Sequence, residues 1–277
     1  MSPAEFQALP SQPADHRIAY GDDTNQFGDL RLPASPGPRP VVVLVHGGCW
    51  KEPYATLRDM APLADALKAA GIASWNIEYR RIPQPGSGWP GTFQDVGRAV
   101  DHLRALASTH RLDLDRVIVM GHSAGGHLAL WAAARHRLPP HSPLHAPNAL
   151  RVKGVVDLAG VGDLQAFMPA QAEGCRDASV VETLLGGAPS AVPERYVQAS
   201  ATRLLPLGTP QILVWGEQDE MTPLRFGHAH VDAARRAGDD ARLIAVPSLG
   251  HFEIADPASP AWSVVLQAVR SLLETRP

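Results

Sequence analysis

The chain has 277 residues and a formal net charge of −3 at pH 7, and 45% of its residues are hydrophobic. This length and composition suit one α/β domain over residues 1–277 with a substantial buried core. No block of lysine or arginine occurs, which argues against nucleic acid or an anionic membrane surface as a partner. The longest apolar runs, such as residues 41–45, have the length of a strand and are too short to cross a bilayer.

Two further features bear on the cellular compartment. The N-terminus has an acidic residue where a signal peptide needs a basic one, and it lacks an apolar segment, so we predict a cytoplasmic protein. The two cysteines, Cys49 and Cys175, are too few for a disulfide framework, and nothing in the sequence indicates that they pair.

Eight short apolar runs predict strands that alternate with helices. The first two lie close together, and we expect an antiparallel hairpin at one edge of the sheet. The central runs are rich in Val, Ile and Leu without alternation, as in parallel strands buried on both faces. The pattern predicts a mostly parallel eight-stranded sheet with helices on both faces. The predicted strands are residues 17–20, 27–32, 41–45, 72–78, 117–120, 152–158, 211–215 and 242–246.

Helices are predicted from apolar residues that recur every three or four positions. One begins near Thr92, where residues 92–95 resemble a capping box, and its apolar positions continue to Ala107. Glycines are expected to end two others, at Gly71 and Gly238. Together with the helix that begins near Thr92, the predicted helices are residues 60–70, 127–137, 224–237 and 261–273.

Two stretches interrupt this alternation. Residues 160–209, rich in Gly, Pro and Ala, lie between the sixth and seventh predicted strands, and we expect a small cap-like insertion there, with Phe167 and Met168 adding an apolar lid surface. Residues 139–147 are rich in proline and are expected to form an exposed loop. The histidines at positions 136, 141 and 145 have no helix or strand to bring them together, so we predict no metal site.

The most informative motif is Gly121-His-Ser-Ala-Gly125, which follows an apolar strand and precedes an apolar helix. In this context, G-x-S-x-G is the nucleophile elbow, a sharp turn that holds the serine in a strained conformation. The flanking glycines remove Cβ atoms that would clash in the turn. Ser123 is therefore the candidate nucleophile, close to the N-terminal amides of the helix that follows.

A serine hydroxyl needs a base to remove its proton, and the base needs a carboxylate that fixes its tautomer. After a nucleophile elbow, the acid precedes the histidine along the chain. Asp219 comes soon after a predicted strand, where sites of open α/β sheets gather. It is preferred to its rivals Glu217 and Glu220.

The candidate base is His251, which follows Gly250 on the loop that leaves the last predicted strand. Such a loop can bring the imidazole over the sheet edge toward the serine. His228 and His230 also follow the acid, but both fall within a helical pattern.

The oxyanion that develops in acyl transfer needs aimed hydrogen-bond donors. One is expected from the amide of Ala124, directly after the nucleophile. The other donors are expected from the amides of Gly48 and Cys49, in the His-Gly-Gly-Cys-Trp segment after the predicted strand 41–45. We expect His46 to brace this loop.

With these motifs in order, the chain resembles the α/β-hydrolase superfamily, and within it the esterase and kynurenine-formamidase-like group. The resemblance extends from about Tyr20 onward and implies an α/β-hydrolase fold and a Ser–Asp–His hydrolase of esters or N-formyl amides that uses no metal or cofactor. Formamidases of this group often have a tyrosine where this chain has Cys49, which changes the pocket but not the amide. The motifs that carry the resemblance are residues 46–50, 76–79, 121–127, 216–219 and 250–251.

Three side chains are predicted to bind substrate. Trp50 directly follows the oxyanion loop, Trp89 lies on a loop expected to overhang the site, and Met221 is close to the acid. Cys49 could be a reactive thiol, but Ser123 already occupies the nucleophile position, so we expect a small packing residue.

The sequence therefore predicts a cytoplasmic serine hydrolase of small or aryl carboxylic esters. The alternatives are an arylformamidase that hydrolyses N-formylkynurenine, an esterase of carbohydrate-linked acyl groups, and a non-catalytic ligand receptor. The sequence does not decide between a monomer and a homodimer, and fold alone does not determine the substrate.

Overall fold

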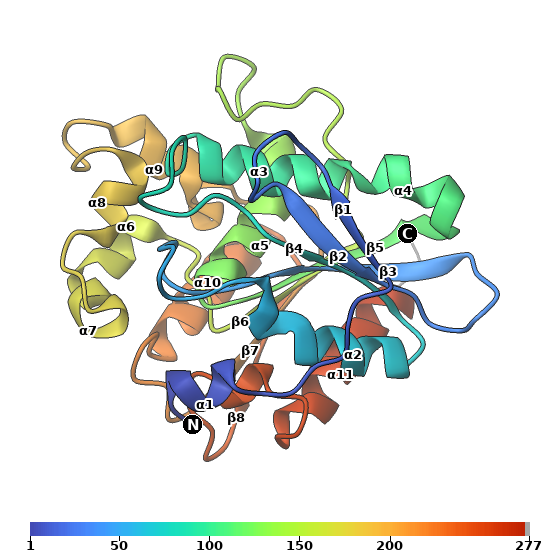
Figure 1. Ribbon diagram of the computed structural model, residues 1–277. Coiled ribbons are helices and arrows are strands. Elements are labelled where there is room, and N and C mark those ends of the chain that lie inside the picture. The colour runs from blue at the N-terminus through green and yellow to red at the C-terminus, as the bar shows by residue number, and fades with distance from the viewer. Residues whose placement is uncertain (275–277) are drawn as a thin grey trace.

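The computed structural model of the protein describes residues 1–274 and contains one eight-stranded sheet in the order β1-β2-β4-β3-β5-β6-β7-β8 (Figure 1). Strand β2 pairs antiparallel with β1 and with β4, and β3 to β8 pair parallel. The eight predicted strands and the edge hairpin are confirmed. The strands are β1 His16–Ala19, β2 Phe27–Arg31, β3 Arg39–Val45, β4 Ala73–Ile77, β5 Leu112–His122, β6 Gly154–Leu158, β7 Gln211–Gly216 and β8 Ala241–Val246.

The central strands are covered by helices on both faces, as the continuous apolar runs predict. Along β3, Val41, Val43 and Val45 pack in one hydrophobic cluster with residues of α3, α4 and α5. Val42 and Leu44 point to the opposite face and pack with residues of α2 and α11. Figure 1 shows these two helical layers above and below the sheet.

The predicted helices are present, with one division that the sequence pattern did not indicate. The helix expected after Thr92 is split into α3 and α4 at His102. The helices outside the segment between β6 and β7 are α1 Pro3–Gln7, α2 Ala61–Ala69, α3 Gly91–Asp101, α4 Leu103–His110, α5 Ala124–Ala134, α10 Arg225–Arg236 and α11 Ala261–Glu274, with 3-10 turns at Leu57–Met60, Arg135–Arg137 and Glu253–Ala255.

The predicted capping box at residues 92–95 is wrong. Helix α3 begins after Pro90 and has no side-chain cap. The Thr92 hydroxyl instead donates to the carbonyl of Arg80 at 2.6 Å, and Asp95 accepts from the Arg80 guanidinium at 2.7 Å. Both polar side chains therefore hold the loop after β4 and do not cap the helix. Asp95 is buried, and the positive charge of Arg80 in that loop compensates its carboxylate.

Short helices occupy the chain between β6 and β7, where the cap-like insertion is expected. We call residues 164–204 the helical segment. In Figure 1 it lies at one end of the sheet, beside the start of α3. Its elements are α6 Leu164–Phe167, α7 Gln171–Cys175, α8 Val180–Leu185 and α9 Pro193–Ala199, with 3-10 turns at Met168–Ala170 and Ala201–Leu204.

The two cysteines form a disulfide, which corrects the expectation from the sequence. Cys49 lies in the loop after β3 and Cys175 at the end of α7, 126 residues further along the chain. Only the fold brings their Cα atoms to 5.8 Å, within the range that a disulfide spans. The packing role expected for a free Cys49 thiol is therefore replaced by a covalent bond between the β3 loop and the helical segment.

Within residues 1–274, no helix combines the length and the apolar character needed to span a membrane.

Candidate active site

Ser123 lies at a sharp turn between the end of β5 and the start of α5. Its backbone has φ 56° and ψ −122°, a conformation that is costly for any residue with a side chain. A Cβ at Gly121 would overlap the carbonyl oxygen of Gly125, and a Cβ at Gly125 would overlap that of Val45. The Ser123 amide donates to the Leu158 carbonyl at 2.8 Å, which fixes the turn on the neighbouring strand. The structure therefore has the strained turn that the motif predicts.

Asp219 and His251 are joined by a hydrogen bond of 2.7 Å between Oδ2 and Nδ1, and both side chains are buried. Asp219 Oδ1 accepts from the amides of Met221 and Thr222 at 2.9 and 2.8 Å. Burial raises the pKa of Asp219, but the hydrogen bonds from His251 and Thr222 outweigh it and hold this pKa below its ordinary value. Asp219 is therefore an ionised carboxylate that fixes the Nδ1–H tautomer of His251. The rivals Glu217 and Glu220 are exposed.

His122, the residue directly before the serine, is hydrogen-bonded to the loop that carries His251. Its Nε2–H donates to the His251 carbonyl at 2.9 Å, and the two imidazole rings lie 4.6 Å apart between centroids. Burial, and then the proximity of His251, lower the pKa of His122 to about 3, so its ring is neutral at neutral pH. This contact was not predicted from the sequence, although the G-x-S-x-G motif places a second histidine directly before the serine.

The loop after β3 passes directly beside the serine. A Cβ at Gly47 would lie 2.9 Å from the His122 carbonyl oxygen and 3.1 Å from the Ser123 Cβ. Gly48 and Cys49 both have positive φ, at 92° and 50°, which turns the backbone tightly at this point. On the other side, Ala124 begins α5, where the first amides have no partner within the helix.

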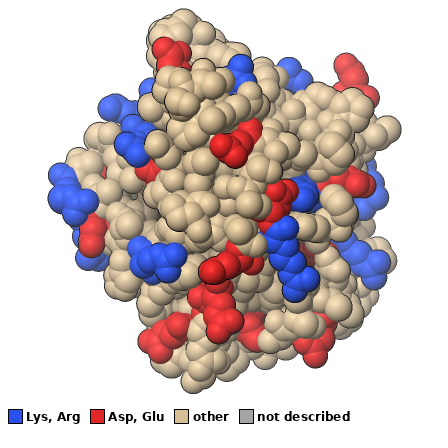
Figure 2. Space-filling model, turned by 90° about the vertical axis from the view of Figure 1, so that its left-hand side faces the viewer, with Lys and Arg blue, Asp and Glu red and all other residues tan. Residues whose placement is uncertain are grey.

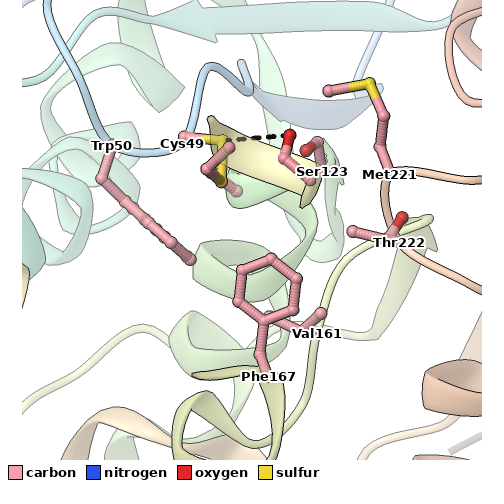
Figure 3. Close-up of a pocket in the computed structure, with 10 residues that line it drawn as sticks. Cys49, Trp50, Ser123, Val161, Phe167, Met221 and Thr222 are labelled. Atoms are coloured by element: carbon pink, nitrogen blue, oxygen red, sulfur yellow. Dashed lines mark hydrogen bonds between the residues drawn. A yellow bond between two sulfur atoms is a disulfide. The ribbon is translucent and has the colours of Figure 1, made fainter. Parts of the chain in front are cut away.

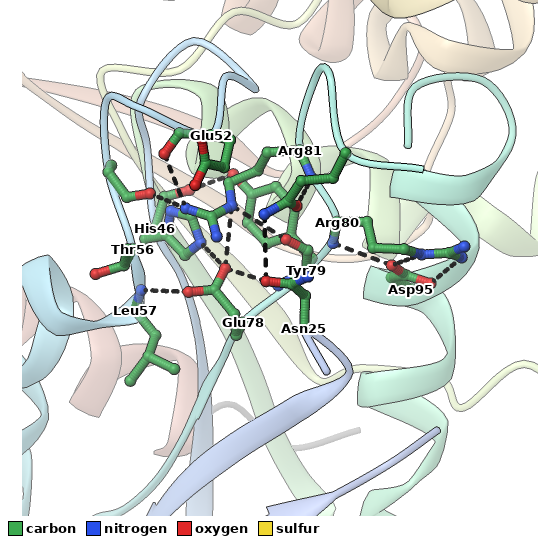
Figure 4. Close-up of polar contacts among 12 residues, drawn as sticks. Asn25, His46, Glu52, Thr56, Leu57, Glu78, Tyr79, Arg80, Arg81 and Asp95 are labelled. Carbon is green, nitrogen blue, oxygen red and sulfur yellow. Dashed lines mark hydrogen bonds and ion pairs between the residues drawn. The ribbon is translucent and has the colours of Figure 1, made fainter. Parts of the chain in front are cut away.

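A buried polar cluster fixes the start of the loop after β3 (Figure 4). His46 Nε2 donates to Glu78 Oε1 at 2.8 Å, and Glu78 Oε2 accepts from the Leu57 amide at 3.1 Å. The Tyr79 hydroxyl donates to the His46 carbonyl at 2.9 Å, and Arg81 lies 3.3 Å from Glu78. The expectation that His46 braces the loop is confirmed.

Glu78 is the charged centre of this cluster. Burial alone raises the pKa of a carboxyl group, but His46 and Arg81 reverse that effect and lower the pKa of Glu78 below its ordinary value. A buried carboxylate that remains ionised needs such compensation on every side. Its loss would leave the His46 ring without its acceptor and the Arg81 guanidinium without its counter-ion.

A small cavity of about 10 Å³ opens beside Ser123, with room for roughly one water molecule (Figure 3). Trp50, which is buried, and Met221 both line it, as the sequence analysis expects of substrate-binding residues. Trp89 is not among its lining residues. It packs against Phe93 of α3, and its amide donates to the Leu184 carbonyl in the helical segment.

His127 is a further buried residue that the sequence analysis did not single out. Its Nδ1 accepts from the Trp50 indole N–H at 3.2 Å, and its Nε2–H donates to the Ala199 carbonyl at 2.8 Å. Burial lowers the pKa of His127 to about 4, which keeps Nδ1 available as an acceptor. One side chain of α5 thus fixes both the Trp50 ring and the end of α9.

The sheet order, the left-handed serine turn and the helices on both faces define the α/β-hydrolase fold. The structure of Thermogutta terrifontis esterase 2 phosphoramylated by tabun superposes with a TM-score of 0.75 at 19% identity and covers 95% of both chains. The chain belongs to the BD-FAE family, whose model matches residues 29–230.

Two curated relatives show the range of proteins to which the chain is similar. Esterase LipC of Mycobacterium tuberculosis is 27% identical over 250 residues, which cover 87% of this chain and 60% of LipC. The kynurenine formamidase of Meyerozyma guilliermondii is 29% identical over 123 residues and 44% of each chain. The chain spans about three fifths of the length of the first curated relatives that it matches.

Proposed function

We propose that the protein is a serine hydrolase of carboxylic esters, with Ser123 as nucleophile, His251 as base and Asp219 as the acid that orients the base. The observation that carries this proposal is the buried 2.7 Å hydrogen bond between His251 and Asp219, on a loop fixed by His122 to the strained serine turn. Relatives named as esterases support the same reaction class.

The first half of the reaction uses the tautomer that Asp219 fixes. Because Nδ1 of His251 carries the proton shared with Asp219, Nε2 is the ring nitrogen that accepts the proton of the Ser123 hydroxyl. The serine oxygen then bonds to the ester carbonyl carbon, and the carbonyl oxygen becomes an oxyanion. In this proposal, the amides of Gly48, Cys49 and Ala124 donate to that oxyanion.

The second half returns the enzyme to its starting state. His251 gives its proton to the leaving alcohol, which departs and leaves an acyl group on Ser123. Water then attacks the acyl carbon as His251 takes one of its protons, and the carboxylic acid leaves as Ser123 regains its hydrogen. One ester and one water thus yield one acid and one alcohol, with no metal or cofactor in the scheme.

The surroundings of the serine favour a small uncharged acyl group. The cavity holds roughly one water-sized group and is lined by Trp50, Phe167 and Met221, which carry no charge. Figure 2 shows that uncharged residues cover most of the middle of the face that carries the helical segment, with acidic and basic side chains mixed around it. Surface charge of a single sign steers charged ligands, and a neutral ester does not need it. The mixed charges on this face are therefore compatible with a neutral substrate.

An arylformamidase is the second candidate. A formyl group has no carbon beyond the carbonyl and therefore fits a cavity of about 10 Å³ at least as well as an acetyl group. The kynurenine formamidase among the relatives supports this candidate. The proposed catalytic residues are the same for both reactions.

Steady-state kinetics test the two candidates. We expect the wild-type protein to hydrolyse p-nitrophenyl acetate. In the Ser123→Ala variant, kcat should fall at least about 10³-fold while the circular dichroism spectrum stays unchanged. A higher kcat/KM for N-formylkynurenine than for any ester would assign the protein to the formamidases. Full ester hydrolysis by Ser123→Ala would contradict the proposed nucleophile.

A further inference from the structure

The Cys49–Cys175 disulfide lies inside the site and not on the surface of the fold. Both cysteines are buried and both line the cavity beside Ser123 (Figure 3). Cys49 is also one of the residues whose amide is proposed to bind the oxyanion. The bond therefore joins the loop that faces the carbonyl oxygen to the segment that closes the cavity.

The end of α7 also contacts two other parts of the chain around the cavity. A Cβ at Gly174 would overlap the Met221 carbonyl, so the α7 backbone lies directly on the loop that follows Asp219. The same Cβ would lie 3.4 Å from the Phe167 ring of α6, which meets the Trp50 ring edge-on with centroids 6.4 Å apart. The cavity is small because these backbones and rings are held close together.

The other polar side-chain contacts of α7 do not replace the bond to the β3 loop: Gln171 donates to the Ala178 carbonyl at 2.6 Å and accepts from the Val181 amide at 3.0 Å, both within the helical segment. The helix has five residues, and Arg176, which follows it, is in the left-handed conformation with φ 51°. The Lys51–Asp177 ion pair, 2.9 Å long, joins the same two parts of the chain, but both side chains are about one quarter exposed. Such partly exposed pairs contribute little to holding two segments together.

We propose that the Cys49–Cys175 disulfide limits the length of the acyl group that the site accepts. The bond holds the end of α7 against the oxyanion loop, and the cavity then admits a formyl or acetyl group and excludes longer chains. This inference rests on the proposed ester hydrolysis at Ser123.

A chain-length series measures this effect. We would compare kcat/KM for p-nitrophenyl acetate, butyrate and hexanoate in the wild-type protein, in Cys175→Ala, and in the wild-type protein reduced with a phosphine until thiol titration finds two free thiols. Reduced wild type keeps both sulfur atoms and loses only the bond, which separates the tether from the bulk of the sulfur. Lys51→Ala, which breaks the ion pair and keeps the disulfide, is the matched control.

We expect the wild-type protein and Lys51→Ala to prefer acetate to hexanoate by about 100-fold or more, since each added methylene can cost tenfold in a closed pocket. In Cys175→Ala and in the reduced protein, this preference should fall at least about tenfold, through a rise in hexanoate turnover. Circular dichroism confirms that each protein is folded.

Several results would overturn the inference. Two free thiols in the untreated, unfolded protein would show that the bond does not form. An unchanged acetate preference after reduction, with or without lower thermal stability, would show that the bond does not set chain length. If the wild-type protein hydrolyses no ester or formamide, the proposed function fails first, and the inference fails with it.

Discussion

Glu78 lies beside the proposed oxyanion loop, and in the proposed reaction it acts without touching the substrate. Glu78 holds His46 and the Leu57 amide, and His46 begins the loop whose next residues face Ser123. An amide donor in an oxyanion hole is effective only when it is aimed at the place where charge develops. Glu78 is thus a positioning residue for the proposed site.

Glu78→Gln keeps the shape of the side chain and removes its charge. Because the loop loses an ionic anchor, we expect kcat for p-nitrophenyl acetate to fall by about tenfold or more with little change in KM. The exposed Glu52→Gln, in the same loop region, is the control and should retain wild-type kinetics. A raised KM with unchanged kcat would instead indicate a role in substrate binding.

At the scale of elements, the disulfide joins the β3 loop to α7 across 126 residues. Closing a loop of this length restricts the unfolded chain strongly, and the usual entropy relation gives about 4 to 5 kcal/mol. We expect Cys175→Ala to lower the free energy of unfolding by about 2 to 5 kcal/mol, measured by urea denaturation at equilibrium. Equal unfolding midpoints for this variant and the oxidised wild type would contradict this expectation.

The same bond bears on the compartment. Disulfides persist in oxidising environments and are rare in the cytosol of mesophiles. The cytoplasmic location expected from the N-terminal residues therefore remains a prediction, and the Cys49–Cys175 bond weighs against it.

The elements that sequence reasoning predicted well are those with a local signal. Val41–Val45 is apolar without interruption and forms a buried strand, and Gly121 and Gly125 bracket the serine turn. The order of acid and base along the chain, together with their positions after predicted strands, selected Asp219 and His251, which are hydrogen-bonded in the structure.

The features that sequence reasoning missed depend on contacts between distant parts of the chain. Asp95 resembles a helix cap locally but is fully buried and pairs with Arg80, because a buried carboxylate needs a charged partner. Cys49 and Cys175 carry no spacing signal, since their separation is set by the fold. Trp89 lies on a loop as expected but packs against α3, away from the lining of the cavity.

For the molecule as a whole, buried neutral histidines make stability depend on pH. Burial lowers the pKa of His122 to about 3 and those of His127 and His230 to about 4. A group whose folded pKa is lowered stabilises the fold above its unfolded value, near 6.5, and that contribution is lost as pH falls toward the folded pKa. For each such histidine, acidification from pH 6.5 to the folded pKa lowers the free energy of unfolding by on the order of 3 kcal/mol.

We therefore expect the free energy of unfolding to fall between pH 6.5 and about 4, the interval bounded by the unfolded and folded pKa values. Burial raises the pKa of Asp157 to about 7, which acts in the opposite direction over this interval, but the three histidines outweigh this one carboxyl group. His230→Gln, which lies outside the proposed site, should reduce the difference in stability between pH 7 and pH 5. The exposed His141→Gln is the control and should leave the difference unchanged. Urea denaturation at the two pH values measures both, and an equal pH dependence in all three proteins would contradict this account.

In the proposed reaction, Ser123 is a nucleophile activated by the His251–Asp219 pair. The most direct measurement is covalent labelling with a small alkyl fluorophosphonate, followed by peptide mapping in the wild-type protein and in His251→Ala. We predict a single modified peptide with the label on Ser123, and a labelling rate at least about 10³-fold lower in His251→Ala. A folded wild-type protein that remains unlabelled at Ser123, or that is labelled equally fast without His251, would contradict the claim.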